Sequence, residues 1–110
     1  MLDYSGDDVL MLLVNGMILE KPERRGMSIV LPWKNLIQGL NHASVIFRSR
    51  YDREGVGCIS HTDNDNKQYI YTYFEPCSAN RAVPIFDQPD LKAKMYLNII
   101  APPSWKVASN

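Results

Sequence analysis

The chain has 110 residues, which is enough for one domain and no more. Its 12 basic and 12 acidic side chains cancel and are scattered along the sequence. This balance disfavours nucleic acid or an anionic membrane surface as a partner. The apolar run VLMLLV is too short for a membrane span and follows two aspartates, unlike a signal peptide. We therefore expect a soluble protein with no membrane segment and no targeting segment.

The two cysteines, Cys58 and Cys77, lack the C-x-x-C spacing of a metal or redox pair. Two reduced thiols fit an intracellular protein, whereas a disulfide would indicate an oxidising compartment. We expect reduced thiols and an intracellular location, and the sequence leaves a disulfide open.

Short strands joined by turns are predicted for the first part of the chain. The apolar run Val9–Val14 ends at Asn15-Gly16, a strong hairpin signal, and residues 17–19 would form the returning strand. The segment SIVLP predicts a short strand that Pro32 ends. In WKNLIQGLN, residues 33–41, apolar side chains recur at helical spacing and predict a helix of about two turns.

Alternating patterns dominate the rest of the chain. Residues 44–51 alternate, with Val45 and Phe47 on one face, and the tyrosines of KQYIYTYF share one strand face. The clearest alternation covers residues 93–101, and WKVAS at 105–109 predicts one more short strand. Roughly six or seven strands with a single helical turn predict an all-β fold, an antiparallel β-sandwich.

Motifs for self-contained chemistry are missing from the sequence. His42 and His61 stand in loop-like contexts, and a zinc site built from them would need unidentified partners. The stretch DNDNK from Asp63 resembles the start of a calcium loop but lacks its central glycine and final glutamate, so a turn explains it better. No P-loop, dinucleotide fingerprint or activated serine occurs. We expect no catalytic residue, metal or cofactor in this chain.

One segment resembles a known family. FEPCSANRAVPIFDQPDLKAKMYLNIIAPPSWKVASN, residues 74–110, resembles the end of the N-terminal β domain of M1 zinc aminopeptidases, where FEP, A-x-R and P-x-F-D-x-P-D-L-K-A are hallmark elements. LVNG, IVLP and the later TD..D…Y.YT pattern fall in the order expected for that domain. The resemblance implies that residues 1–110 form part of this β-sandwich domain, incomplete at its N-terminus and without the zinc catalytic domain.

The resemblance also implies a role for Glu75. In the family, an acidic residue at this position helps to hold the free α-ammonium group of the substrate, and many members carry an amide at the position of Tyr73. A fixed carboxylate selects exopeptidase substrates because it pairs with a terminal ammonium through charge-assisted hydrogen bonds. The expected substrate-binding residues are therefore Glu75 and Tyr73. The implied ligand is a peptide N-terminus, and the implied zinc belongs to the catalytic domain of the family.

Purely structural roles are the alternatives for several of these side chains. From the residues alone, Glu75 would cap a turn or pair with a surface arginine. We expect Arg81 to be a structural ion-pair partner, for example of Asp87 or Asp90, and the tyrosine stripe to be a sheet face rather than a binding platform.

Three functions are compatible with the sequence. The chain is expected to be the N-terminal domain portion of an M1-type aminopeptidase, packed on a catalytic domain or a companion polypeptide. The first alternative is a non-catalytic, aminopeptidase-derived subunit with a structural or binding role in a larger assembly. The second is an isolated sandwich that binds peptides weakly. Because the motifs G-x-M-E-N and H-E-x-x-H do not occur, we expect no hydrolysis by this chain alone.

Overall fold

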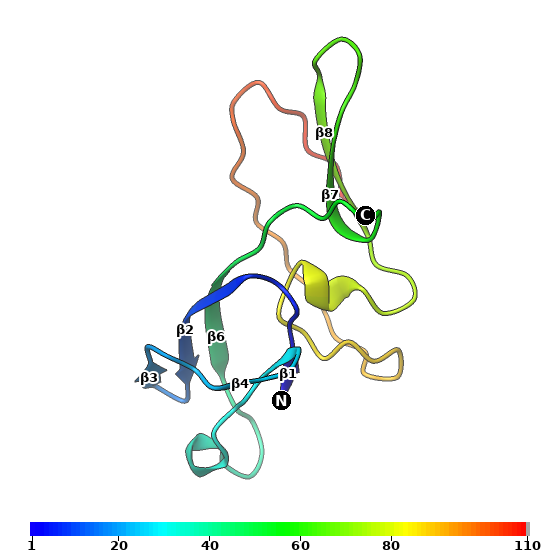
Figure 1. Ribbon diagram of the computed structural model, residues 1–110. Helices are drawn as coiled ribbons and strands as arrows, with labels where there is room; N and C mark the ends of the chain where they lie inside the picture. Colours follow the sequence, from blue (N-terminus) through cyan, green and yellow to red (C-terminus); the bar gives the residue numbers. More distant parts are fainter. Residues whose placement is uncertain (110) are drawn as a thin grey trace.

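The computed structural model describes residues 1–109. Eight short strands form three sheets, with the orders β1-β5-β4, β3-β2-β6 and β7-β8, and every ladder is antiparallel (Figure 1). No α-helix occurs among the described residues, so the predicted all-β, antiparallel fold class is confirmed. The strands are β1 (Leu2–Asp3), β2 (Asp8–Val14), β3 (Met17–Leu19), β4 (Arg24–Arg25), β5 (Ser28–Ile29), β6 (Ala43–Arg48), β7 (Gly57–Thr62) and β8 (Gln68–Tyr73), and the 3-10 helices are η1 (Trp33–Asn35) and η2 (Ala79–Arg81).

The β2–β3 hairpin forms where the Asn-Gly signal predicts it. Asn15 and Gly16 have φ values of 48° and 87°, so both adopt the left-handed conformation that a two-residue hairpin turn requires. On its other edge β2 pairs with β6, which gives the three-stranded sheet β3-β2-β6. Val45 and Phe47 of β6 pack on the core from the same face, as their alternation predicts.

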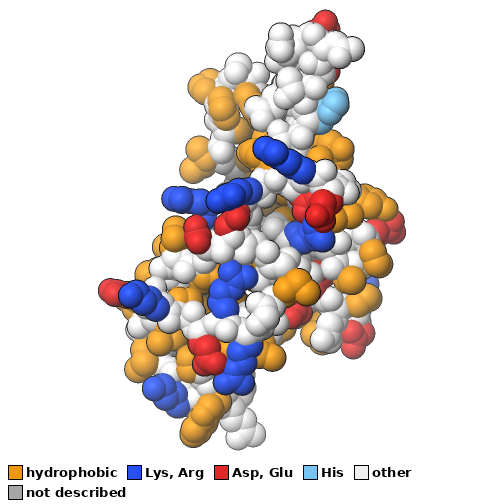
Figure 2. All heavy atoms as spheres, in the orientation of Figure 1, with side chains coloured by type: hydrophobic (Ala, Val, Ile, Leu, Met, Phe, Trp, Pro, Cys, Tyr) orange, Lys and Arg blue, Asp and Glu red, His pale blue; other side chains and the backbone are white. Residues whose placement is uncertain are grey.

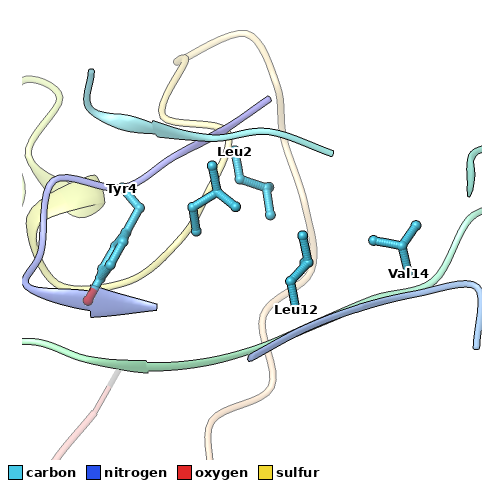
Figure 3. Packing of buried hydrophobic residues seen from close by; sticks show 5 residues of the cluster. Leu2, Tyr4, Leu12 and Val14 are labelled. Carbon is cyan, nitrogen blue, oxygen red and sulfur yellow. The ribbon is translucent and has the colours of Figure 1, made fainter. Parts of the chain in front are cut away.

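The core lies between the sheets β1-β5-β4 and β3-β2-β6 (Figure 3). Tyr4 is its largest side chain, and its hydroxyl donates to the Arg48 carbonyl at 2.7 Å and lies 2.8 Å from Ser49 Oγ. The phenol is therefore buried with its polar atom satisfied, as burial requires. The cluster consists of Leu2, Tyr4, Leu12, Val14 and Ile29.

The β7–β8 hairpin stands away from this core, as Figure 1 shows. The radius of gyration is 15.8 Å, whereas a compact chain of this length would have a value of about 13 Å. The molecule is accordingly elongated, with principal extents of 53 × 29 × 25 Å. The face seen in Figure 2 mixes basic and acidic side chains and shows no patch of one sign. Within residues 1–109, no helix has the length and apolar character needed to cross a membrane.

The helix predicted for residues 33–41 is wrong. Only Trp33–Asn35 form a 3-10 turn, Leu36 is extended, and the chain bends at residues 38–39. A helix this short gains its stability mainly from packing an apolar face, and Trp33 and Leu40 are instead exposed to solvent. The apolar side chains at helical spacing therefore have no described surface to pack against, and the helix does not form.

The strands predicted at residues 93–101 and 105–109 are also wrong, since neither segment is a strand. Between residues 93 and 101, no backbone hydrogen bond is formed with any other described residue. Alternation indicates which side chains share a face, but a strand also needs a ladder partner. The described part of the chain does not provide that partner.

Candidate functional site

The loop that follows β8 holds the two predicted site residues together. Tyr73 ends β8, and Glu75 precedes Pro76 through a cis peptide bond. The Tyr73 hydroxyl donates to Glu75 Oε2 at 3.3 Å. Phe74 lies between them and points elsewhere, because it lines a groove of about 880 Å³ with Leu97 and other apolar side chains. Phe74 therefore anchors the segment while Tyr73 and Glu75 face solvent.

The Glu75 carboxylate is exposed and unneutralised. Among the described residues, no lysine, arginine or histidine lies within ion-pair distance of it. Its oxygens cap no backbone N–H either, because the turn is closed by the Ser78 N–H donating to the Phe74 carbonyl at 2.8 Å. Neither of the local roles considered from the sequence, a turn cap or a partner of a surface arginine, is therefore present at Glu75.

Arg81 is a structural ion-pair partner, as predicted, but its predicted partners are wrong. Its Nη1 donates to Asp52 Oδ2 and to Glu54 Oε2, each at 2.8 Å, and not to Asp87 or Asp90. The hydrogen bond from Arg81 is the main reason why the pKa of Asp52 lies below its usual value. With two carboxylates already bound, the Arg81 guanidinium ties η2 to residues 52–54 and leaves Glu75 unpaired.

Close backbone packing accompanies this ion pair. Gly57 begins β7 opposite Tyr73, and its φ of 85° is a conformation that glycine adopts without strain. A Cβ atom at Gly57 would lie 3.0 Å from the Arg81 Cβ. The glycine thus allows η2 to approach the end of the hairpin that carries the Tyr73–Glu75 pair.

Asn80 and Asp87 hold the remainder of the loop, a contact that the sequence did not predict. The Asn80 side-chain amide donates to Asp87 Oδ2 at 2.7 Å, and its backbone N–H donates to the same oxygen at 3.0 Å. Ser5 Oγ donates in turn to Asn80 Oδ1 at 2.6 Å. Asn80 and Asp87 are seven residues apart and belong to no recognisable motif. The sequence therefore offered no reason to pair Asp87 with Asn80 and not with Arg81. The segment is consequently tied to the N-terminal part of the chain.

Three tyrosines of β8 share one half-exposed face: Tyr69, Tyr71 and Tyr73. Their partners in the ladder with β7 are His61, Ile59 and Gly57. The Tyr69 hydroxyl donates to Asp63 Oδ2 at 3.0 Å. Asp63 Oδ1 accepts the N–H groups of Asp65 and Lys67 at 2.9 Å, and these bonds, the one from Lys67 first, hold the pKa of the Asp63 carboxyl below its usual value. The turn interpretation of DNDNK is therefore confirmed.

Metal-binding side chains do not gather in the described part of the chain. Within residues 1–109, no group of three or more His, Cys, Asp or Glu side chains could hold a metal ion. Cys58 and Cys77 are free thiols, and burial raises the pKa of the Cys58 thiol. The described residues thus do not fit a catalytic zinc ion, which needs three protein ligands.

Proteins with related sequences include two aminopeptidases from different organisms. The family profile of the Peptidase M1 N-terminal domain matches residues 17–110. A protein of Streptomyces lividans named Aminopeptidase N is 34% identical over 111 residues, which cover 99% of this chain and 13% of that protein. A Probable M1 family aminopeptidase 1 of Encephalitozoon cuniculi is 35% identical over 82 residues, which cover 74% of this chain and 9% of that protein. The chain thus spans only a small part of these relatives, and no solved structure matches it.

Proposed function

The chain belongs to the M1 peptidase family, as part of its N-terminal domain, and on this premise we propose that it provides the loop that recognises the free amine of a peptide substrate. In this proposal Glu75 binds the α-ammonium group. The chain packs on a zinc catalytic domain formed by residues outside it. The observation that supports the proposal is the exposed Glu75 carboxylate, which has no cationic partner among the described residues.

An unpaired carboxylate is suited to this role for an energetic reason. A carboxylate already bound to arginine would have to exchange one cation for another, so the substrate ammonium would gain little from it. Glu75 has no such partner to lose, and a charge-assisted hydrogen bond to ammonium is about twice as strong as a neutral one. The neighbouring guanidinium of Arg81 does not compete, because Asp52 and Glu54 already bind it.

Tyr73 supports Glu75 in this proposal by orienting its carboxylate. The phenol donates to Oε2 and leaves Oε1 available to the ammonium group. Hydrogen bonds of the loop, from Ser78 N–H to the Phe74 carbonyl and from Asn80 to Asp87, hold the backbone beneath it. A preorganised acceptor lowers the entropy that is lost when the substrate binds, and it fixes the substrate amine relative to the reacting bond.

Hydrolysis itself is assigned to other residues. A zinc ion held by a catalytic domain outside this chain would supply the Lewis-acid chemistry that peptide hydrolysis needs. This chain contributes only the binding and orientation of the amine terminus. Neither alternative function gains a specific observation from the described residues.

The test is a charge-removing substitution in the complete enzyme that contains this chain. We expect Glu75→Gln to lower kcat/KM for an aminoacyl anilide by roughly 30- to 150-fold, or about 2–3 kcal/mol, because a charged hydrogen-bond partner is lost. The matched control is Glu20→Gln, at an exposed glutamate in the loop after β3. Unchanged kcat/KM in the Glu75 variant, or equal losses in both variants, would contradict the proposed role.

A further inference from the structure

The segment from Tyr73 to Arg81, which carries Glu75, begins and ends beside the same glycine. Tyr73 is the partner of Gly57 in the antiparallel ladder of β7 and β8. At the other end of the segment, a Cβ atom added at Gly57 would lie 3.0 Å from the Cβ of Arg81 and 3.6 Å from its Cδ. The two ends therefore meet at one residue, and the chain between them is a closed loop.

Hydrogen bonds connect the turn around Glu75 directly to η2. The Ser78 N–H donates to the Phe74 carbonyl at 2.8 Å and closes the turn that contains Glu75. The Ser78 carbonyl in turn accepts the Arg81 N–H at 3.2 Å. Because the same residue takes part in both bonds, a displacement of η2 would be passed on to the backbone that carries the Glu75 carboxylate.

Asp52 holds the far end of this loop. Arg81 Nη1 donates to Asp52 Oδ2 at 2.8 Å, and the Asp52 side chain is only 14% exposed. The Asp52 backbone is itself attached to β7, because its N–H donates to the Cys58 carbonyl at 2.7 Å. Asp52 Oδ1 accepts the Glu54 N–H at 2.6 Å, which orients the carboxylate. The contact from Arg81 to Asp52 therefore leads back to the strand that pairs with the start of the segment.

The second carboxylate bound by Arg81 contributes less to this attachment. Glu54 Oε2 also lies 2.8 Å from Arg81 Nη1, but the Glu54 side chain is 74% exposed. An exposed ion pair is weak because water screens it. A mostly buried carboxylate is costly to leave without its partner. Asp52 is thus the anchor, and Glu54 offers a matched control at the same distance from the same nitrogen.

We propose that Arg81 is a positioning residue for amine recognition: by holding η2 to Asp52, it closes the loop at Gly57 and fixes the direction of the Glu75 carboxylate. This inference rests on the proposed function of Glu75 and assigns Arg81 no contact with the substrate. A carboxylate on a loop with one free end would sample many directions, and substrate binding would have to order it. Attachment of both ends removes that freedom before the substrate arrives.

The test compares two inhibitors of the complete enzyme that contains this chain. Leucine hydroxamate and isocaprohydroxamate differ only in the α-amino group. The inhibition constant of isocaprohydroxamate divided by that of leucine hydroxamate therefore measures amine recognition alone. We expect Arg81→Met to lower this ratio at least about fivefold, by weakening only the binding of the inhibitor that has the amine. Inhibition constants are measured on the active fraction, so partial misfolding of a variant does not change them.

The two carboxylates bound by Arg81 provide the second variant and its control. Asp52→Asn should lower the ratio as Arg81→Met does, because it removes the charge that holds the guanidinium. Glu54→Gln should change the ratio by less than about twofold, since an exposed ion pair contributes little. An unchanged ratio in Arg81→Met, or equal effects of Asp52→Asn and Glu54→Gln, overturns the inference.

A double variant separates this inference from the proposed function. If Arg81 acts through Glu75, then Arg81→Met should lower the ratio by less than about twofold in a Glu75→Gln background, because the charge to be positioned is already absent. Full additivity of the two substitutions overturns the positioning role and leaves Glu75 as the amine ligand. An unchanged ratio in Glu75→Gln alone overturns the proposed function, and the positioning role with it.

Discussion

Arg81 illustrates how much of the site a sequence can reveal at the scale of a residue. Its structural role was predicted, because an arginine in a loop rich in acids usually forms ion pairs. Its partners were not, because Asp52 and Glu54 lie well before it in the sequence and reach it only through the fold of β7. Tyr73 and Glu75 were easier to place together, since residues two apart at a strand end share a side. Local geometry was predictable, and long-range pairing was not.

Substitution of Arg81 should change how the stability of the chain depends on pH. The pKa of Asp52 is lowered in the folded chain, so the unfolded state binds more protons in the acid range. The stabilisation by Asp52 is therefore present above the unfolded pKa and is lost as the pH falls through the folded pKa. We expect Arg81→Met to reduce the free energy of unfolding at neutral pH and to flatten its decline between about pH 5 and pH 2.

Urea denaturation at a series of pH values would measure this effect. Arg53→Met is the matched control, because it removes an exposed arginine from the same turn. Parallel stability curves for wild type and Arg81→Met would show that the ion pair does not contribute to acid sensitivity.

At the scale of elements, the sequence predicted strand pairing best where a clear turn signal joins the two strands. Asn15-Gly16 determined the β2–β3 hairpin because the turn itself sets the register. The strand β7 was not predicted, because GCISHT has neither strong alternation nor a run of β-branched residues. Residues 93–101 failed in the opposite way, since their clear alternation meets no partner in the described chain. An alternating sequence indicates that a segment is amphipathic, whereas the formation of a strand also depends on a partner elsewhere in the molecule.

The uneven burial along β2, whose register against β6 shifts between Val9 and Met11, gives a direct test of the core. Leu12 is fully buried among Leu2, Tyr4 and Ile29, whereas Leu10 of the same strand is 47% exposed. We expect Leu12→Ala to lower the free energy of unfolding by about 2–5 kcal/mol through lost burial and the cavity left behind. Leu10→Ala should change it by less than about 1 kcal/mol. Shifts in the urea midpoint at constant m value would measure both, and equal costs would place the core elsewhere.

The whole molecule combines one small core with a projecting hairpin and an exposed loop after β8. Only the sheets β1-β5-β4 and β3-β2-β6 enclose buried side chains in number among the described residues, and the Tyr73–Glu75 pair lies at the base of the separate β7–β8 hairpin. A carboxylate in this position can form one wall of a cleft. In the proposed function, the opposite wall and the reacting groups come from residues outside this chain, which separates recognition from chemistry.

This separation predicts that the purified chain, supplied with zinc, releases no N-terminal residue from a peptide or an aminoacyl anilide. A catalytic zinc needs three protein ligands and a base, such as H-E-x-x-H with a further ligand, and this motif does not occur in the sequence. Within residues 1–109, no alternative cluster of ligands replaces it. The assay compares anilide hydrolysis with and without a chelator and uses an active zinc aminopeptidase as the positive control. Chelator-sensitive release would contradict the prediction if it follows the chain through purification. If the Glu75→Gln variant still released the N-terminal residue, the activity would come from a contaminating peptidase. If the variant lost this activity, the complete site would lie in this chain.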